Sequence, residues 1–345
     1  MTLAPRVSVI TIFRDGERYL EQAIASVRAQ TLAGWELLLV DDGSTDGSSA
    51  LARAHAARDP QRIRYLEHPA RANLGMSASR NLGLAEARAP YVAFLDADDV
   101  YLPRRLERHA ALLDAEPSVA LVQSESVYWM APRAADDAAA ELRLPRGTWP
   151  DGTLVEPPQA LVALLALPSF AVPICDLTVR RRVALELGGF EAEFRGLCED
   201  RVFLTKLYFG QQVLICGEFL AKVRCHDASC THSTQLSAHR ADGAYQRGIG
   251  AFQRWTARYL RAHGVSDPTL LELAARWAGA GTSARGRGRF MMLRTLAFGW
   301  LERHAPRPVY HALVSAYHRA VRRYTLWCFQ RLQAEARRRD GAGPS

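Results

Sequence analysis

Lysine is almost absent from this sequence, and long hydrophobic runs are missing. Lys206 and Lys222 are the only lysines, so nearly all of the 44 basic residues are arginine. We attribute this bias mainly to genome composition, although the planar guanidinium group also suits phosphate recognition. No apolar run reaches the roughly 18 residues that a membrane-spanning helix needs. We therefore predict that no segment of the sequence crosses a bilayer.

Cysteine is scarce and irregularly placed, which argues against a disulfide framework. There are six cysteines among 345 residues, and the first residues lack the charged, apolar and small-residue order of a secretory leader. We therefore expect a reduced, cytoplasmic protein. With 48% hydrophobic and 23% charged residues, the composition is that of a globular protein with a large core.

The net charge of +8 favours anionic partners. Nucleotides and phospholipid surfaces are both candidate partners on this ground. The sequence has no recognised nucleic-acid-binding motif, and its basic residues gather toward the end of the chain. We therefore expect no nucleic acid partner.

Short β-rich segments alternate with amphipathic segments in the first part of the chain. Buried strands are predicted at 7–13, 35–40, 91–95 and 119–129, with a short one at 62–68, and helices at 15–30, 48–57, 75–89 and 103–116. Asp15 is placed to cap the first helix. This alternation predicts an α/β fold with a Rossmann-like, mostly parallel sheet, whose ligands lie at the carboxyl ends of the strands.

The rest of the chain divides into an insertion and a tail. Residues 131–153 are rich in Ala, Asp, Pro and Gly, and we interpret them as a surface insertion. Arginine-rich helical patterns after Ser233 predict one domain over 1–233 and a basic, mainly helical C-terminal region over 234–345. Those helices either pack on the main domain or lie on an anionic membrane surface.

The segment "DDGSTDGS" directly follows the second predicted strand. Asp and Ser side chains commonly bond their own backbone, so a simple turn explains the composition. The functional alternative is a nucleotide seat, in which the Asp41 and Asp42 carboxylates accept from a base N–H or a ribose hydroxyl. Both interpretations remain open from the residues alone.

The segment "DADD" after the strand "YVAFL" concentrates negative charge more strongly. Asp96, Asp98 and Asp99 repel one another, so they need a cation, donors or open water. Carboxylates at positions i and i+2 of a tight turn can face one Mg²⁺ or Mn²⁺ ion, which also takes ligands from substrate phosphates. One acid could instead cap the next helix. Three acids exceed that need, which favours metal or nucleotide binding.

Two further clusters carry candidate chemistry. Glu199 and Asp200 stand at the start of a predicted helix, where they serve either as caps or as a general base. In "VRCHDASCTH" the spacing of Cys and His does not match the usual zinc patterns. Three roles stay open for His226: a structural histidine, a hydrogen-bond donor to phosphate, or a metal ligand.

Taken in order, these elements resemble family 2 glycosyltransferases of the GT-A fold. The resemblance covers about residues 6–232. It rests on "VSVIT", on "SVRAQT" with "WELLLVDDGSTDGS", on "ANLGMSASRNLGLAEARAPYVAFLDADDVYLP", on "LGGFEAEFRGLCEDRVFLTKL", and on the R-x-H-x-x-S spacing near residue 226. Each motif is weak by itself, whereas five in register make an accidental match improbable.

The resemblance implies roles for individual residues. Asp200 matches the catalytic base of the family's "ED" motif. The nucleotide-binding positions are Ile12, Arg14, Asp41, Asp42, Arg80 and Asp96, with Asn81 beside them. Asp98, Asp99 and His226 match metal-side positions, and Glu199, Arg224 and Ser229 are expected on the acceptor or diphosphate side.

The sequence also departs from the family's pattern. Many members carry Pro-x-Tyr-Asn after the first strand, where this chain has Ile12, Phe13, Arg14 and Asp15. Stacking of a base on tyrosine is therefore in doubt. Lys206 stands where an arginine is usual, and no Q-x-x-R-W signature of processive synthases occurs at a comparable position. The resemblance thus implies single-sugar transfer.

We accordingly expect an inverting, metal-dependent glycosyltransferase that uses Mn²⁺ or Mg²⁺ and a nucleoside-diphosphate sugar, with a UDP-sugar as the first choice. The acceptor would be a glycan, a lipid-linked molecule or a small molecule, in the synthesis of surface polysaccharide, lipid glycan or glycoconjugate. Peripheral contact with the inner face of the membrane through the C-terminal helices is a second option for location. The competing hypotheses are a non-catalytic relic of the same fold and a sugar-1-phosphate nucleotidyltransferase.

Overall fold

The computed structural model describes residues 4–130, 140–143, 149–166, 172–226, 244–266, 270–271 and 273–274. Contacts divide the chain into two compact units. One unit runs to Phe252, apart from short excluded segments, and contains all the residues of the site described below. The other includes Val162 to Ala166 and the chain from Gln253 onward.

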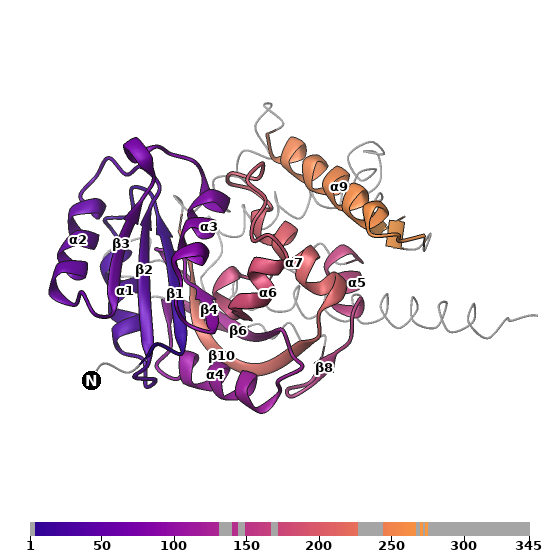
Figure 1. The fold of residues 1–345 in the computed structure, drawn as a ribbon, viewed down its shortest axis with the longest axis horizontal. Helices are drawn as coiled ribbons and strands as arrows, with labels where there is room; N and C mark the ends of the chain where they lie inside the picture. Colours follow the sequence, from indigo (N-terminus) through magenta and orange to yellow (C-terminus); the bar gives the residue numbers. More distant parts are fainter. Residues whose placement is uncertain are drawn as a thin grey trace, which may run out of the picture. The chain divides into compact units, whose positions relative to one another are not determined.

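Four parallel strands form the first half of a single sheet (Figure 1). They lie in the order β3 (Ile63–Glu67), β2 (Trp35–Asp41), β1 (Val7–Phe13) and β4 (Tyr91–Phe94). Every residue of β1, β2 and β4 is buried. Continuous apolar runs of this kind are expected for parallel strands that are covered on both faces.

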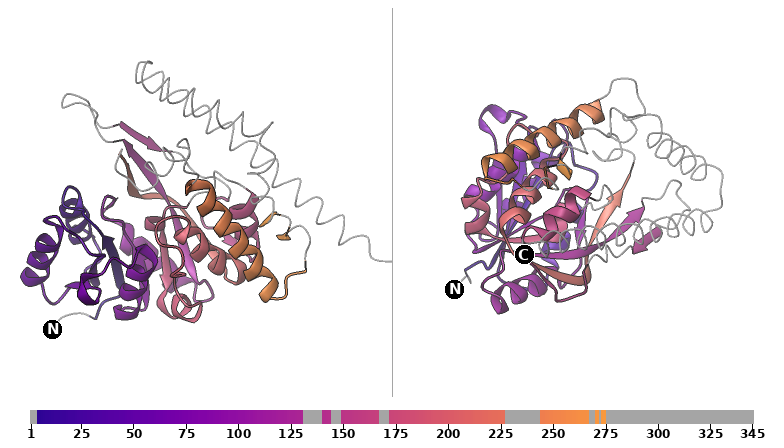
Figure 2. Two further views of the ribbon diagram at one scale, coloured as in Figure 1. Left: turned by 90° about the horizontal axis from the view of Figure 1, so that it is seen from above. Right: turned by 90° about the vertical axis from the view of Figure 1, so that its right-hand side faces the viewer.

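The second half of the sheet mixes directions. Beyond β4 come β9 (Leu177–Arg180), β6 (Leu121–Met130), β10 (Val213–Cys225) and β5 (Val100–Tyr101). β9 is antiparallel to both neighbours, whereas β6 and β10 form a long parallel pair, which Figure 2 shows running side by side. Register shifts between Ile215 and Ala221 accompany the curvature of β10.

The predicted surface insertion at 131–153 is partly a strand. β7 (Ala140–Arg143) pairs antiparallel with β6 and so extends the sheet, while residues 131–139 and 144–148 lie outside the described residues. The insertion therefore contributes backbone pairing, a feature that its Ala- and Asp-rich composition does not predict. Another short strand, β8 (Leu154–Val155), pairs with β10.

Helices cover both faces of the sheet. α1 (Leu20–Arg28), α2 (Ser48–Arg58) and α4 (Arg105–Ala115) share one hydrophobic core with alternate residues of β1, β2 and β4. On the other face, α3 (Met76–Glu86) packs on β1, and α7 (Glu199–Gly210) packs on β4 through Phe203 and Phe94. α6 (Arg181–Glu186) contacts α3, and further helical segments are η1 (Pro69–Arg71), α5 (Gln159–Ala166) and η2 (Ile174–Asp176).

The start of α1 differs from the sequence prediction. The helix begins at Leu20, five residues later than expected, and Asp15 does not cap it. Asp15 has a φ of 50°, and its carboxylate accepts hydrogen bonds from the N–H and the hydroxyl of Thr45. A tertiary contact with the neighbouring loop thus replaces the expected local cap.

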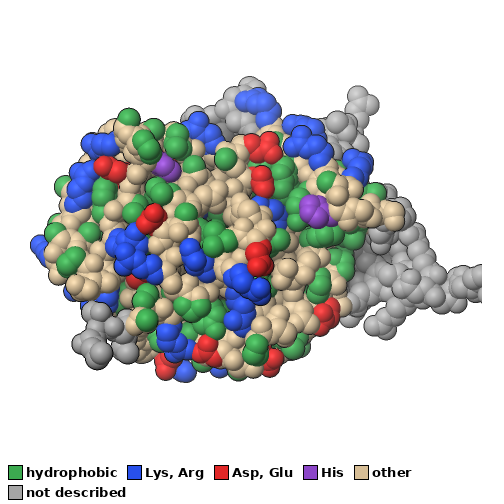
Figure 3. All heavy atoms as spheres, in the orientation of Figure 1, with side chains coloured by type: hydrophobic (Ala, Val, Ile, Leu, Met, Phe, Trp, Pro, Cys, Tyr) green, Lys and Arg blue, Asp and Glu red, His purple; other side chains and the backbone are tan. Residues whose placement is uncertain are grey.

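The tail contains one long described helix, α9 (Ala244–Ala262), which has no acidic residue. Phe252, Trp255 and Leu260 are buried, while the arginines of the helix are exposed, at positions 247, 254, 258 and 261. Figure 3 shows basic side chains along this helix, whereas elsewhere on the face drawn they are interspersed with acids. None of the described helices is long and apolar enough to span a bilayer.

Candidate functional site

The two polar loops "DDGS" and "DADD" meet at one edge of the sheet. β1 lies between β2 and β4, and Phe13 pairs with Asp41 in the β1–β2 register. Asp42 N–H donates to the Phe13 carbonyl, and Leu95 N–H donates to the Ile10 carbonyl, so both loops leave the sheet beside β1. Parallel topology therefore brings "DDGS" and "DADD" together, as the alternation of elements predicts.

The Asp41 carboxylate points into the protein. It is 1% exposed and accepts from Ser44 N–H, from the Ser49 hydroxyl and from the Tyr65 hydroxyl. Burial alone would raise the pKa of Asp41, but the hydrogen bonds from Ser49, Ser44 and Tyr65 outweigh it and leave the pKa below its ordinary value. The side chain fixes the loop and is charged at neutral pH.

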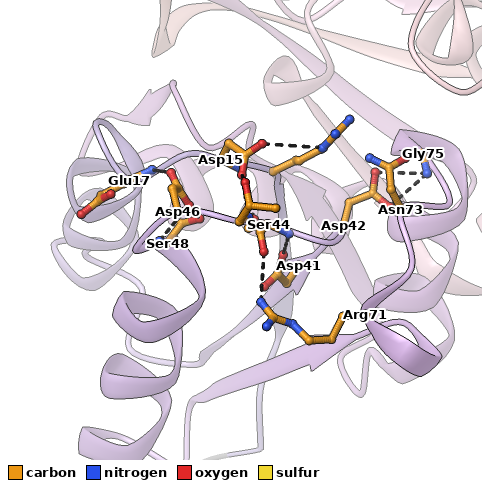
Figure 4. Close-up of polar contacts among 12 residues, drawn as sticks. Asp15, Glu17, Asp41, Asp42, Ser44, Asp46, Ser48, Arg71, Asn73 and Gly75 are labelled. Carbon is orange, nitrogen blue, oxygen red and sulfur yellow. Dashed lines mark hydrogen bonds and ion pairs between the residues drawn. The ribbon is translucent and has the colours of Figure 1, made fainter.

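The Asp42 carboxylate points the other way, toward the loop before α3. Its oxygens accept from Leu74 N–H at 2.8 Å and from Gly75 N–H at 3.0 and 3.1 Å, as Figure 4 shows for Gly75. Gly75 has a φ of 92°, and a Cβ there would lie 2.8 Å from Arg195 Cβ. Asp42 thus holds a tight glycine turn and keeps an acceptor lone pair on Oδ2, because a carboxylate has about four such positions.

The loop after β1 and the "DDGS" loop are bonded to each other in both directions (Figure 4). Asp15 N–H donates to Ser44 Oγ, Glu17 N–H donates to Asp46 Oδ2, and Gly47 N–H donates to Glu17 Oε2. Gly43 has a φ of 79°, and a Cβ there would lie 2.7 Å from the Arg71 carbonyl oxygen. These contacts hold the "DDGS" backbone in one shape.

Two of the positions that depart from the family's Pro-x-Tyr-Asn, Ile12 and Arg14, differ in exposure. Ile12 is buried at 7% and lies in the sheet opposite Val40. The Arg14 side chain is 58% exposed, and its Nε lies 3.8 Å from Asp15 Oδ2. Arg14 is thus the side chain of this pair that a bound molecule could contact.

Arg71 is a contact that the sequence analysis missed. Its guanidinium donates to the Ser44 carbonyl at 3.0 Å and to the Ser49 hydroxyl at 3.1 Å. Ala70 and Arg71 both have a φ of 54°, which is uncommon for residues with a Cβ. No pattern in "HPARANLG" predicts these contacts, because they depend on the "DDGS" loop, which lies next to Arg71.

Asp98 and His226 face each other across the second loop. His226 Nε2 lies 3.0 Å from Asp98 Oδ2, and Asp98 is 31% exposed at the side chain. His226 Nδ1 is buried and has no hydrogen-bond partner among the described residues. Two residues 128 positions apart therefore offer a carboxylate and an imidazole at one point.

Asp99 has a different environment from Asp98. It is 5% exposed, and its Oδ1 accepts from Arg224 N–H at 2.8 Å. Burial, with the charges of Asp98 and Asp96, raises the pKa of Asp99 well above its ordinary value. This carboxyl group joins the "DADD" turn to β10, and Asp98 is the more accessible of the two.

A divalent cation fits this arrangement if substrate supplies the remaining ligands. Among the described residues no group of three His, Cys, Asp or Glu side chains is close enough to hold a metal by itself. Mg²⁺ and Mn²⁺ are commonly bound by one or two protein ligands together with phosphates and water. Asp98 and His226 supply two such ligands. In the contact shown, His226 Nε2 carries the proton, because a carboxylate only accepts, so metal binding at Nε2 would leave the proton on Nδ1, which has no partner among the described residues.

Arg224 is held between two aromatic rings. Its guanidinium carbon lies 4.5 Å from the centroid of the Tyr19 ring and 3.9 Å from that of Trp129, while its Nε donates to the Asp98 carbonyl. The Tyr19 ring also lies 4.7 Å from the His226 ring. Sequence reasoning missed Tyr19 and Trp129, because "ERYLEQ" and "VYWM" are typical of an ordinary helix and an ordinary strand.

Arg80 joins the second loop to the "ED" motif. Its side chain is 2% exposed, and its terminal nitrogens contact Asp96 at 2.8 Å and Glu199 at 3.1 Å. Burial is the main reason that the pKa of Glu199 is raised to about 7; the charge of Asp200 adds to the rise, whereas Arg80 opposes it. Asn81 next to it exchanges two hydrogen bonds with the backbone of Phe190.

Asp200 is the partly exposed acid of the "ED" pair. Neither Glu199 nor Asp200 caps α7, which begins at Glu199 after the left-handed Cys198. The Asp200 carboxylate accepts from Arg201 N–H. Burial raises the pKa of Asp96, Arg80 opposes the rise, and the charges of Asp98 and Asp200 add to it. The ion pairs of Arg80 with Asp96 and Glu199 bring the start of α7, which carries Asp200, to the "DADD" loop. Ser229, Cys230 and His232 lie outside the described residues.

Comparison with known sequences finds relatives that match about a third of the chain. The protein named as glycosyltransferase EpsE of Bacillus subtilis is 40% identical over 114 residues, which is 33% of this chain and 40% of EpsE. TuaG of the same organism, named for teichuronic acid biosynthesis, is 38% identical over 105 residues, 30% of this chain and 40% of TuaG. The matches thus span well under two thirds of each relative.

Comparison with solved structures supports the fold. The structure of S. aureus TarS 1-349 in complex with UDP-GlcNAc superposes with a TM-score of 0.59 at 16% identity, covering 96% of this chain and 92% of that one. The fold is therefore the GT-A fold predicted from the sequence. The family model for glycosyl transferase family 2 matches residues 8–185, just over half of the chain. The chain belongs to glycosyl transferase family 2.

Proposed function

We propose that the chain transfers a single sugar from a nucleoside-diphosphate sugar to an acceptor hydroxyl, with inversion at the anomeric carbon. The observation that carries this proposal is the convergence of three groups at one sheet edge: the Asp98–His226 pair, the Asp96 loop and the start of α7 with Asp200. Family membership supports the reaction class.

The donor would lie along the carboxyl ends of β1, β2 and β4. Asp42 Oδ2 and Arg14 are the groups of the first loop that we assign to the nucleoside, since the Asp41 carboxylate is only 1% exposed and faces donors inside the protein. Asp96 would accept from a ribose hydroxyl. UDP is the nucleotide that we propose first, because TarS, which shares the fold, is described in complex with UDP-GlcNAc.

Asp98 and His226 would hold a Mn²⁺ or Mg²⁺ ion, with Asp99 supporting the loop from inside. Such an ion would supply positive charge for the leaving nucleoside diphosphate. Arg224 adds permanent positive charge close to Asp98 and keeps it in place through its contact with the Asp98 carbonyl.

Asp200 would act as the general base. Its carboxylate takes the proton of the acceptor hydroxyl, whose oxygen then bonds to the anomeric carbon as the bond to the diphosphate oxygen breaks. One displacement inverts the configuration, and no enzyme nucleophile is needed, unlike in a retaining hydrolase. Partial exposure of Asp200 leaves room for an acceptor to approach.

The acceptor would belong to a surface polysaccharide, a lipid glycan or a glycoconjugate. The name of TuaG, which refers to teichuronic acid, supports this class. If the acceptor is lipid-linked, the exposed arginines of α9 would meet an anionic membrane, while Phe252, Trp255 and Leu260 of that helix are buried.

The experiment that tests the proposal combines binding with turnover. Titration calorimetry with UDP, GDP and dTDP, each with and without Mn²⁺, should show metal-dependent binding of one nucleotide. Asp98→Asn should weaken that binding. Asp200→Asn should leave it nearly unchanged while release of the nucleotide from its sugar donor falls by about 10²- to 10⁴-fold, the usual contribution of a general base.

Three outcomes would contradict the proposal. If none of the three nucleotides binds, the chain is not a transferase for these donor classes. If Asp200→Asn releases nucleotide at the wild-type rate, another group is the base. Binding without any turnover in the wild-type protein would instead favour a non-catalytic relic of the fold.

A further inference from the structure

Arg80 combines complete burial with two charged partners. At 2% exposure, its side chain offers almost no surface to a bound molecule. Its NH2 group donates to Asp96 Oδ1, and its NH1 group donates to Glu199 Oε1. A buried guanidinium is stable only when it is paired and hydrogen-bonded, so these two carboxylates and Arg80 depend on one another.

The surroundings of Arg80 fix its direction. The guanidinium carbon lies 5.4 Å from the centroid of the Phe190 ring, and Phe190 stacks on Phe203 of α7 with centroids 4.2 Å apart. Asn81, the next residue on α3, holds the backbone of Phe190 by two hydrogen bonds of 2.7 Å. The guanidinium therefore sits on an aromatic platform that belongs to the same packing as α7.

The two carboxylates that Arg80 joins belong to different halves of the proposed reaction. Asp96 follows β4 and precedes the Asp98 loop, whereas Glu199 is the first residue of α7 and the neighbour of Asp200. Arg80 joins these two segments through an ion pair with each carboxylate. The planar fork of arginine can serve a partner at each end, which the single ammonium of lysine cannot do with the same geometry.

We propose that Arg80 is a positioning residue that couples the donor side of the site to the base, and that it does not itself contact the donor. It sets the distance between the Asp96 loop and the start of α7 through its two ion pairs. The assignment of the two sides rests on the function proposed above, whereas the tether itself does not.

The first test needs no ligand. Amide hydrogen exchange is measured on free wild-type protein and on Arg80→Lys, over segments 95–100 and 198–204. We expect faster exchange in both segments of the variant. The control is Arg180→Lys, because the Arg180 guanidinium likewise makes several hydrogen bonds, to backbone carbonyls, but lies beside Tyr91, at the opposite end of β4. It should leave both segments unchanged.

The second test uses UDP with Mn²⁺ as the probe and a mutant cycle as the readout. Glu199→Gln should weaken UDP binding in the wild-type background by about tenfold, although Glu199 lies on the base side, because residues in one ion-pair network are energetically coupled. In the Arg80→Lys background the same change should have little further effect. A purely structural role for Glu199 would weaken binding equally in both backgrounds.

Two results would overturn the proposal. Unchanged exchange at both segments in Arg80→Lys would show that no tether exists, and an equal effect of Glu199→Gln in both backgrounds would show that Arg80 does not transmit it. Should Arg80→Lys fail to fold, Glu199→Gln alone must speed exchange at 95–100. Failure of wild-type protein to bind UDP would count against the proposed donor, and the exchange result would still decide the tether.

Discussion

Asp41 and Asp42 are consecutive residues whose carboxylates have unrelated surroundings. Asp41 is surrounded by donors from the loop, α2 and β3, and Asp42 by the amides before α3. Alternation of side chains along an extended segment sends neighbours to opposite sides, which explains the difference. Substitutions of the two should therefore have different consequences.

Asp41→Asn should destabilise the protein at neutral pH by about 1–3 kcal/mol, the usual cost of disrupting a buried hydrogen-bonded charge. Because the pKa of Asp41 is lowered in the folded state, its contribution is present above the unfolded value of 3.8 and is lost as the pH falls through the folded value. Urea unfolding of both proteins at several pH values checks this.

The difference between wild type and Asp41→Asn should therefore be constant near neutral pH and shrink below about pH 4. A difference that grows on acidification would contradict the assigned direction of the pKa shift. Asp59→Asn is a suitable control, because Asp59 pairs with Arg62 at the end of α2, outside the candidate site.

At the scale of elements, α3 lies very close to β1. A Cβ on Gly83 would come within 2.5 Å of Ile10 Cγ2, so the helix touches the strand through its backbone. This closeness matters for the site, because α3 also carries Arg80 and follows the Asp42-bound turn. The small residue at position 83 thus sets the height of Arg80 above the sheet.

Gly83→Ala should destabilise the protein by roughly 1–3 kcal/mol through overpacking, against the gain of about 1 kcal/mol that alanine usually gives inside a helix. Gly210→Ala is the matched control. Gly210 ends α7 and is exposed, and a Cβ added there would meet nothing within 4 Å, so alanine should be neutral or stabilising. Thermal melts of the two variants that shift the same way would contradict this packing.

The sequence predicted the elements of the first sheet half well, and for a physical reason. In buried strands and amphipathic helices, burial produces an apolar pattern that is visible directly in the order of the residues. β7 and the late start of α1 were not predictable, since one depends on pairing with β6 and the other on hydrogen bonds to the "DDGS" loop. Such contacts join segments that are distant in the chain.

At the scale of the whole molecule, the chain is basic although its candidate site is acidic. A net charge of +8 coexists with five carboxyl groups around the start of α7 and the "DADD" turn. Positive charge over the remaining surface attracts an anionic donor, while the local acids would repel it without a cation. Nucleotide and metal should therefore bind together better than either binds alone.

We expect Mn²⁺ alone to raise the melting temperature little, because the described residues offer it only Asp98 and His226 at close range. UDP with Mn²⁺ at about 100 times Kd should stabilise the protein by about 2.7 kcal/mol. Differential scanning calorimetry with each ligand separately and with both together checks the synergy.

Asp98→Asn should abolish that synergy, whereas Asp59→Asn should keep it. Equal stabilisation by UDP with and without Mn²⁺ would argue against a metal held between the donor and Asp98. A large effect of Mn²⁺ alone would indicate a site that has more protein ligands than the described residues show.

The sequence by itself determined the class of fold, the polar loops that follow the strands, and the family. These follow from short-range patterns, namely apolar runs, turn residues and paired acids after strands, which residue order encodes directly. Only the tertiary structure decided which acid faces inward, that His226 meets Asp98, that Arg224 lies between Tyr19 and Trp129, and that Arg80 is buried between Asp96 and Glu199. The direction of a side chain depends on neighbours that come from distant segments, and its energy is set by burial and charge pairing that exist only once the sheet and its helices have assembled.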